Sequence, residues 1–349
     1  MSKRRTALVT TGLAAGAVAS GIVGRAVLNA RRRRHDPEAH QTLSLLPPDE
    51  LGPVVSFDGT KLAVYASGDP AHPIVLFVHG FSLDLTTWHY QWTELSAAFR
   101  CVLMDLRSHG RSDRAAEGDL SPSAFGRDLA AVVESLPADR PVVIVGHSMG
   151  SMAILAMAEV RPDLFESRVA GCVFVGSAAS DLLRGLMGSI TGMLRPRLGS
   201  LRQAVTRVDR LRRAVLASPG DVAGLVARLT QFGPHAPPHV VAYVVGLAGR
   251  ASTEVWTDAL AGLMDLDLRH AVEHVRVPAL VLVGGHDRVT PPSSAVALAG
   301  AMPDARLEVL EDAGHIPMME APEEFNRRLE RFARGVLGPP SRSRRRRSA

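Results

Sequence analysis

The sequence predicts an α/β fold in which helices cover both faces of a mostly parallel, eight-stranded sheet. Two observations carry this prediction. Short apolar runs alternate with segments of helical periodicity from about residue 50 to residue 336, as in chains that build parallel sheets. Several runs, such as "PIVLFVHG" at 73–80, are apolar throughout, which is typical of a strand buried on two sides. At 349 residues and 46% hydrophobic, the chain can bury a large core.

The elements of the N-terminal half follow in order. "VVSFDGTKLAVYASG" at 54–68 predicts a hairpin around Asp58-Gly59, because Asp-Gly between alternating residues is a strong turn signal. The strand at 73–80 comes next, and then "TTWHYQWTELSAAF" has helical spacing. The remaining expected elements are the strand 100–106, a helix near 121–136, the strand that ends at Ser148 and a helix after it.

The C-terminal half continues the alternation around one insertion. Strands are expected in "VAGCVFVGSA", "ALVLVGGHD" (279–287) and "RLEVLEDAGH" (306–315). Between the sixth and seventh strands, residues 180–250 contain amphipathic stretches with arginines between apolar residues. We therefore expect a core at 50–179 and 251–336, and a helical cap, or lid, at 180–250.

The first 34 residues form a separate basic segment. Thr6 to Gly24 is uncharged for 19 residues, long enough to span a bilayer, although it is rich in Ala and Gly. "AVA" at 17–19 offers a signal-peptide cleavage pattern, whereas "RRRR" at 31–34 tends to stay cytoplasmic. We expect membrane association through residues 6–24, with the side of the membrane open. Secretion after signal-peptide cleavage is the alternative, and a disordered basic arm is the third.

Charge is distributed unevenly along the chain. The formal net charge is +5, but residues 1–34, 180–250 and 342–347 are so basic that the rest carries −15. Such arginine clusters suit anionic surfaces such as lipid head groups. The chain has no recognisable nucleic-acid module, so we expect no specific nucleic-acid partner. Residues 337–349 are expected to be a disordered Arg-rich tail. The oligomeric state stays open.

Cysteine use points away from disulfides and metals. The two cysteines, Cys101 and Cys172, each lie inside an apolar run that reads as a buried strand. There is no CxxC pattern and no Cys/His cluster. We expect neither a disulfide, a metal nor an organic cofactor.

Chemically useful residues follow four of the predicted strands at their carboxyl ends, where sites form in parallel sheets. Ser148 lies in "GHSMG", between a strand and a helix, with glycines that leave room around an exposed serine. A serine hydroxyl needs an imidazole to take its proton and an acid to orient that imidazole. His315 and Asp287 can supply these roles, in the chain order typical of a nucleophile elbow. The backbone N–H groups of Phe81 and Met149 are the candidate oxyanion donors.

At these residues the sequence resembles the α/β-hydrolase superfamily over roughly residues 50–336. The resemblance rests on five blocks in the family's order: "LFVHGF", "DLRSHGRSD", "GHSMGS", "VGGHDRVTP" and "DAGHIPMMEAPEEF". Among its branches, the chain looks most like monoacylglycerol lipases, carboxylesterases and C–C hydrolases with a helical lid. Ser151 departs from the glycine that many relatives have there. Epoxide hydrolases and dehalogenases use Asp at the position of Ser148, so the resemblance excludes them.

Some site assignments have rivals. Asp181, after the preceding strand, is the spare candidate acid, but Asp287 lies in the block that matches the family. His286 and His147 compete with His315 and are interpreted as structural. Asp105, His109 and Asp113 are expected to form a polar loop that braces the site. In the lid, the residues expected to line an apolar pocket are Leu183, Leu186, Met187, Ile190 and Met193.

The combined interpretation is a serine esterase, or lipase, that cleaves a lipophilic carboxylic ester through an acyl-enzyme. C–C hydrolysis, thioester cleavage or cofactor-free perhydrolysis by the same Ser-Asp-His triad is the alternative within catalysis. A non-catalytic binding protein on the same fold is the alternative from another class.

Overall fold

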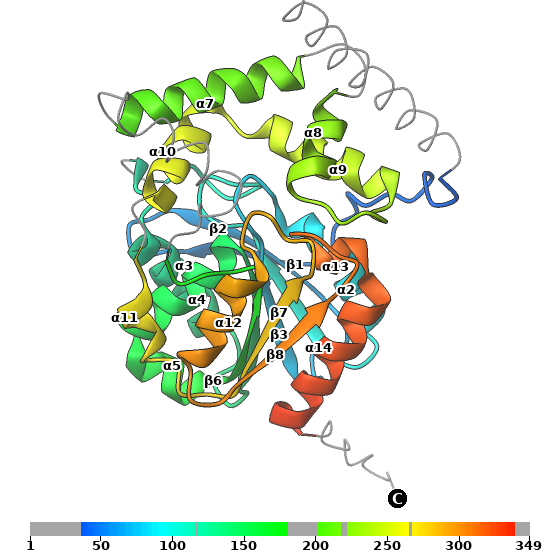
Figure 1. The fold of residues 1–349 in the computed structure, drawn as a ribbon. Coiled ribbons are helices and arrows are strands. Elements are labelled where there is room, and N and C mark those ends of the chain that lie inside the picture. The colour runs from blue at the N-terminus through cyan, green and yellow to red at the C-terminus, as the bar shows by residue number, and fades with distance from the viewer. Residues whose placement is uncertain (1–35, 116–117, 181–200, 218–221, 265–266, 339–349) are drawn as a thin grey trace, which may run out of the picture.

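The computed structural model describes residues 36–115, 118–180, 201–217, 222–264 and 267–338. Its centre is an eight-stranded sheet in the order β1-β2-β4-β3-β5-β6-β7-β8, which confirms the predicted mostly parallel sheet (Figure 1). Among the described strands, β2 alone runs opposite to the others, and it pairs antiparallel with β1 and β4. The strands are β1 Asp49–Val55, β2 Lys61–Ser67, β3 Ile74–Val78, β4 Arg100–Met104, β5 Val142–His147, β6 Val169–Val175, β7 Ala279–Gly284 and β8 Ala305–Leu310.

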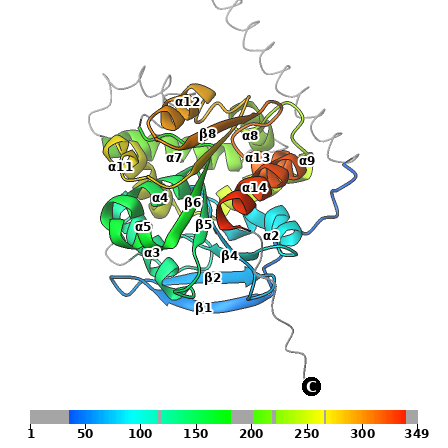
Figure 2. The ribbon, with the colours of Figure 1, turned by 90° about the horizontal axis from the view of Figure 1, so that it is seen from below.

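The first two strands form the hairpin predicted from Asp58-Gly59. Gly59 has a φ of 87°, a conformation that glycine adopts without the steric cost of a Cβ. Val55 pairs with Lys61, and the Ser56 N–H donates to the Thr60 carbonyl at 2.9 Å. The strand β1 begins at Asp49, five residues before the expected start of the hairpin, and forms the edge of the sheet (Figure 2).

The central strands separate two apolar cores. Every residue of β3, β4, β5 and β7 is buried, as expected for strands covered on both faces. Alternate residues face opposite ways, so that Leu76 and Ile144 join one core while Val75 and Val143 join the other. The first face is covered by α3 Pro122–Ser135, α4 Met149–Val160, α5 Pro162–Arg168, α11 Arg269–Val272 and α12 Pro292–Gly300 (Figures 1 and 2).

The second face is covered by two helices that follow β3 and two that follow β8. They are η1 Leu85–Trp88, α2 His89–Leu95, α13 Pro317–Glu320 and α14 Pro322–Leu337. Several helices begin with proline, which suits the first turn because it lacks an N–H and has a helical φ. These packed helices hold the strand ends, and the loops that follow them, in place.

The segment between β6 and β7 adds a further layer of helices over one end of the sheet (Figure 1). It contains α7 Leu201–Leu216, α8 Val222–Thr230, α9 Pro238–Arg250 and α10 Thr253–Met264. Contacts of α9 and α10 with residues that follow β3 show that this layer lies over the carboxyl ends of the strands. The helix α10 packs against α7, although α10 lies beyond residue 250, where the predicted cap ends. The division into core, cap and tails stays a prediction.

Several sequence predictions fall outside the described residues. These include the segment 6–24 and the five expected pocket residues Leu183, Leu186, Met187, Ile190 and Met193. Of the predicted tail, Leu337 belongs to α14, and 339–349 lie outside the described part. Within the described ranges, no helix combines the length and the hydropathy needed to cross a membrane. Cys101 and Cys172 are free thiols buried in β4 and β6.

Candidate active site

Ser148 lies on a sharp turn between β5 and α4. Its backbone has a φ of 49° and a ψ of −111°, a conformation that costs a non-glycine residue strain. The turn is held because the Ser148 N–H donates to the Val175 carbonyl at 2.9 Å. A Cβ on Gly146 would lie 2.6 Å from the backbone of Gly150, so the turn closes only around a glycine. The strained elbow presents a serine that is 9% exposed.

Asp287 and His315 form the hydrogen-bonded pair that the strand ends predict. Nδ1 of His315 lies 2.9 Å from Oδ2 of Asp287, and both residues are buried. Because Nδ1 faces a carboxylate, it carries the ring proton and Nε2 is left free to accept one. Burial opposes ionisation of Asp287, but the His315 ring and hydrogen bonds from Thr290 hold the pKa of this carboxyl below its usual value. The acid is therefore charged and oriented toward the imidazole.

The pair lies beside the Ser148 turn. A Cβ built on Gly176, the residue after β6, would lie 3.2 Å from His315 Nδ1 and 3.3 Å from Asp287 Oδ2. The preceding residue, Val175, accepts the Ser148 N–H. The ends of β5, β6 and β7 and the loop after β8 thus bring Ser148, Asp287 and His315 to one place.

The competing histidines take other positions. His286 is exposed, and only its backbone N–H bonds to the His315 loop, at the Ala313 carbonyl. His147 is buried, and its Nε2–H donates to the backbone carbonyl of His315 at 2.9 Å. Burial lowers the pKa of His147 to about 3, so its ring is neutral. His315 is thus the histidine that meets Asp287. The alternative acid, Asp181, lies outside the described residues.

The predicted oxyanion donors, Phe81 and Met149, belong to adjacent backbone segments. Met149 is the first residue of α4, where the N–H has no partner within the helix. A Cβ on Gly150 would lie 2.3 Å from the Val78 carbonyl and 2.8 Å from the His79 carbonyl. The first turn of α4 therefore lies directly against the end of β3, which leads into Phe81.

Hydrogen bonds of two polar side chains, His79 and Asp105, hold the turn that carries Phe81. The ring of His79 accepts the Leu106 N–H at 3.0 Å and its Nδ1–H donates to the Gly80 carbonyl at 2.8 Å. Burial lowers the pKa of His79 to about 3, so this ring is neutral. Asp105 accepts the N–H groups of Leu85 and Arg111, while burial and the nearby Asp84 raise its pKa to about 7.

The other two members of the expected polar loop, His109 and Asp113, differ in whether their side chains reach the Phe81 turn. The ring of His109 lies 5.5 Å from that of His79 and 6.5 Å from that of Phe81. Asp113 is exposed and contributes only its backbone to the loop. Asp105 and His109 thus support the Phe81 turn, whereas the Asp113 side chain does not.

Side chains of the inserted helices reach this end of the sheet. The Trp256 ring, from α10, lies 5.6 Å from the Phe81 ring, and Trp256 is only 8% exposed. The guanidinium of Arg212, from α7, lies over the Trp256 ring, 5.1 Å from its centre. The hydroxyl of Tyr243, from α9, pairs with Thr86. These contacts place an aromatic ring against Phe81 and join the inserted helices to the residues that follow β3.

Three residues near the site were not singled out by their sequence pattern as functional. Thr290 donates its hydroxyl to Asp287 at 2.8 Å. The Ser151 hydroxyl donates to the Gly146 carbonyl at 2.6 Å and so bridges the elbow. Glu320 accepts three backbone N–H groups around His315. Glu320 lies within the quoted block "DAGHIPMMEAPEEF", which was the available signal.

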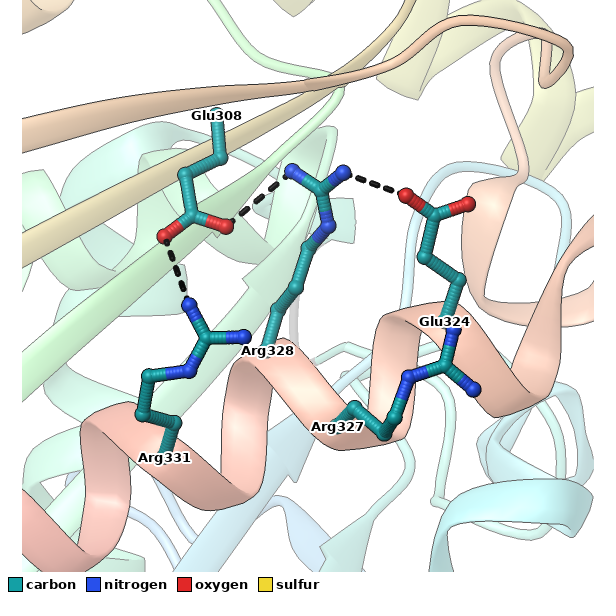
Figure 3. A pocket seen from close by; sticks show the side chains of 5 residues that line it. All are labelled: Glu308, Glu324, Arg327, Arg328 and Arg331. Carbon is teal, nitrogen blue, oxygen red and sulfur yellow. Dashed lines mark hydrogen bonds and ion pairs between the residues drawn. The ribbon is translucent and has the colours of Figure 1, made fainter.

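A hollow of about 350 Å³ lies elsewhere, between β8 and α14. Figure 3 shows that its charged side chains are largely paired with one another: Arg328 bridges Glu308 and Glu324, and Arg331 lies 3.9 Å from Glu308. No residue of the predicted site lines it. Among the described side chains there is also no group of three or more His, Cys, Asp or Glu arranged for a metal ion.

Comparison with known proteins gives consistent relatives. An uncharacterised protein of Mycobacterium tuberculosis is 27% identical over 268 residues, which cover 74% of this chain and 75% of that protein. A pimeloyl-[acyl-carrier protein] methyl ester esterase of Neisseria meningitidis is 26% identical, covering 76% of this chain and 78% of the relative. The solved structure of a thermophilic esterase from Thermogutta terrifontis is 26% identical with a TM-score of 0.65, covering 83% and 99% of the two chains.

A family model also matches more than half of the chain. The model of the alpha/beta hydrolase family matches residues 75–328, which include the elbow, the Asp287–His315 pair and the Phe81 turn. This range also contains five of the eight strands, β4 to β8, and nearly all of a sixth, β3. The chain therefore belongs to the alpha/beta hydrolase family and is a hydrolase enzyme.

Proposed function

We propose that the protein cleaves lipophilic carboxylic esters through an acyl-enzyme formed on Ser148. The observation that carries the proposal is the 2.9 Å hydrogen bond between His315 Nδ1 and Asp287 Oδ2 beside a strained serine elbow. Asp287 keeps the proton on Nδ1, so that Nε2 can act as a base toward the serine. The esterase relatives support ester cleavage over the other reactions that such a triad can perform.

The proposed reaction has two halves. His315 Nε2 takes the proton from the Ser148 hydroxyl as the serine oxygen attacks the ester carbonyl carbon, and the backbone N–H groups of Phe81 and Met149 stabilise the oxyanion. The carbonyl re-forms, the alcohol leaves with the proton from His315, and the acyl group stays on Ser148. Water then attacks the acyl-enzyme with His315 as base, which releases the acid and restores the serine.

Preference for a lipophilic group follows from what surrounds Phe81. In the proposed reaction its backbone N–H binds the oxyanion, so its side chain borders the reacting carbonyl. The Trp256 ring packs on Phe81 and is itself buried. Burying one CH₂ group of a substrate against such a surface contributes about 0.8 kcal/mol, or about fourfold in kcat/KM.

Labelling by a fluorophosphonate probe tests the nucleophile. The purified protein should be labelled, Ser148→Ala should lose all labelling, and Ser151→Ala should keep it because the Ser151 hydroxyl is bound to the Gly146 carbonyl. The absence of labelling in the wild type, or unchanged labelling in Ser148→Ala, would contradict the proposal. A series of aryl esters then tests the substrate class: kcat/KM should rise with acyl chain length, and equal values would exclude a lipophilic preference.

The proposal includes membrane association through residues 6–24. Its support is the uncharged stretch of 19 residues between basic groups, near a body that also carries a basic inserted segment. Cell fractionation with and without residues 1–30 tests it. The shortened chain should leave the membrane fraction, and an unchanged distribution would refute the association. N-terminal sequencing of the mature protein separates an anchor from a cleaved signal peptide.

A further inference from the structure

Glu320 is a partly buried carboxylate that no step of the proposed reaction uses. It is the last residue of α13, five positions after His315. Its Oε1 accepts the backbone N–H groups of Gly314 at 3.0 Å and Ile316 at 3.1 Å, the two neighbours of His315 in the chain. Its Oε2 accepts the N–H of Gly233 at 2.7 Å. One side chain thus holds the His315 loop and a second segment together.

The second segment is the loop between α8 and α9, in the inserted helical layer. It also bonds to the histidine itself, because the His315 N–H donates to the Gln231 carbonyl at 2.6 Å. The two backbones are in direct contact: a Cβ on Gly233 would lie 2.1 Å from the Asp312 carbonyl, and one on Gly314 would lie 2.4 Å from the Gln231 carbonyl. The position of His315 therefore depends on this loop of the inserted layer.

Glu320 needs both carboxylate oxygens to accept the N–H groups of the two segments. Burial raises the pKa of Glu320 to about 6, and the three N–H groups and the nearby His315 ring act in the opposite direction. In the described part of the chain, no arginine or lysine forms an ion pair with Glu320. A glutamine would supply one carbonyl oxygen, so its NH₂ group would have to face at least one N–H donor. A charged group with two acceptor oxygens satisfies both segments at once.

We propose that Glu320 is a positioning residue that couples the docking of the 231–233 loop to the placement of His315. When the loop is docked, Glu320 and Gln231 hold the histidine against Asp287 and beside Ser148. When it is undocked, the His315 N–H loses the Gln231 carbonyl as its acceptor, and Glu320 holds the His315 loop alone. The inserted layer thereby acts on catalysis through the histidine. This inference rests on the proposed function, in which His315 is the base.

The variant Glu320→Gln tests the coupling from the side of the carboxylate. The amide oxygen is expected to keep Gly314 and Ile316, which leaves the Gly233 N–H unpaired. We expect kcat for an aryl ester to fall about tenfold or more with KM changed less than threefold, because the histidine is displaced and substrate contacts remain. The matched control is Glu323→Gln on the exposed side of α14, which should leave both constants unchanged.

The variant Gly233→Ala tests it from the side of the inserted layer, with Glu320 intact. The new Cβ collides with the Asp312 carbonyl, so the loop must move away. The control is Gly246→Ala in α9, where a Cβ meets nothing within 4 Å. If both test variants disturb one contact, the double variant should lose less than the product of the two single losses. Independent, multiplying losses would overturn the coupling.

Hydrogen exchange provides a readout that does not depend on catalysis. Amides in 231–233 and in 312–316 should both exchange faster in Glu320→Gln and in Gly233→Ala, and in neither control. Faster exchange in only one of the two segments, or wild-type kcat in Glu320→Gln, would overturn the inference. If Ser148 fails to label while exchange changes in both segments, the proposed function fails and the contact between the segments stands. Gly233→Ala keeps the test decisive should Glu320→Gln not fold.

Discussion

The substitution Asp287→Asn tests the acid of the proposed triad, and the structure determines which way the new amide would turn. Oδ1 of Asp287 accepts the backbone N–H groups of Val289 and Thr290, each at 2.8 Å. Oδ2 accepts from His315 Nδ1 at 2.9 Å and from the Thr290 hydroxyl at 2.8 Å. Asparagine has one carbonyl oxygen, so its NH₂ group must take one of these two positions.

The two orientations differ greatly in free energy. With NH₂ at the Oδ1 position, the buried N–H of Thr290 and the partly buried N–H of Val289 lose their acceptor, at a cost of about 1–3 kcal/mol for the buried group and less for the other. With NH₂ at the Oδ2 position, both backbone bonds survive and the Thr290 hydroxyl can rotate to accept. The second orientation is therefore expected. It donates to His315 Nδ1, which forces the ring proton onto Nε2, where the base must accept one.

We expect Asp287→Asn to fold normally and to lose most of its catalytic activity. A histidine held in the wrong tautomer lowers kcat by about 10⁴, which corresponds to about 5 kcal/mol in the barrier. The assay is kcat and kcat/KM for an aryl ester, with circular dichroism and urea unfolding to verify the fold. Asp181→Asn is the control, because Asp181 was the alternative acid. A loss below tenfold in Asp287→Asn, or a larger loss in Asp181→Asn, would refute the assignment.

Two further predictions concern the frame of the site. Gly150→Ala should lower the free energy of unfolding by about 3 kcal/mol or more, because its Cβ would meet the Val78 carbonyl at 2.3 Å. The control is Gly249→Ala, which has open space around its Cβ and should be neutral or stabilising in urea unfolding. Equal effects of the two variants would contradict the packing argument. His147→Gln should flatten the acid dependence of stability. The folded pKa is about 3 against 6.5 unfolded, so only the unfolded chain gains this proton below pH 6.5 and wild-type stability falls as pH drops toward 3. The variant should lose about 2 kcal/mol less between pH 6.5 and pH 5, and parallel curves would show that His147 is not neutral in the fold.

Much of the fold could be predicted because its signals are local. The apolar runs that became β3, β4, β5 and β7 are continuous in the sequence, and all of their residues are buried. Asp58-Gly59 specifies its hairpin within a few residues, and Gly146 and Gly150 mark the elbow for the same reason. The boundary of β1 was misjudged because Asp49–Glu50 is exposed and has no apolar alternation.

The candidate site could be predicted in part. Parallel strands all end at the same edge of the sheet, so residues that follow them are brought together whatever the details of packing. This is why Ser148, Asp287 and His315 could be named from the chain. The choice of His315 over His147 and His286 came from the family resemblance, and the geometry assigns each of the three a different contact.

The contacts that hold the site could not be predicted in this way. Glu320 lies in a short helix whose sequence shows only a proline and apolar neighbours, and its partners include Gly233, 87 positions away. Trp256, in the inserted layer, meets Phe81 in the loop after β3. Such contacts depend on how segments distant in the chain approach one another, and no local pattern records that approach.

The sequence by itself determined the parallel sheet, the strand ends that carry the reactive residues and the glycines that the elbow requires. Hydrophobic periodicity and turn chemistry act over a few residues, so each of these features can be read where it occurs. The tertiary structure alone decided that Asp287 points at His315, that His147 is neutral and that Glu320 joins the His315 loop to the inserted layer. Those features arise from burial and from hydrogen bonds between distant segments, and both exist only when the chain has folded.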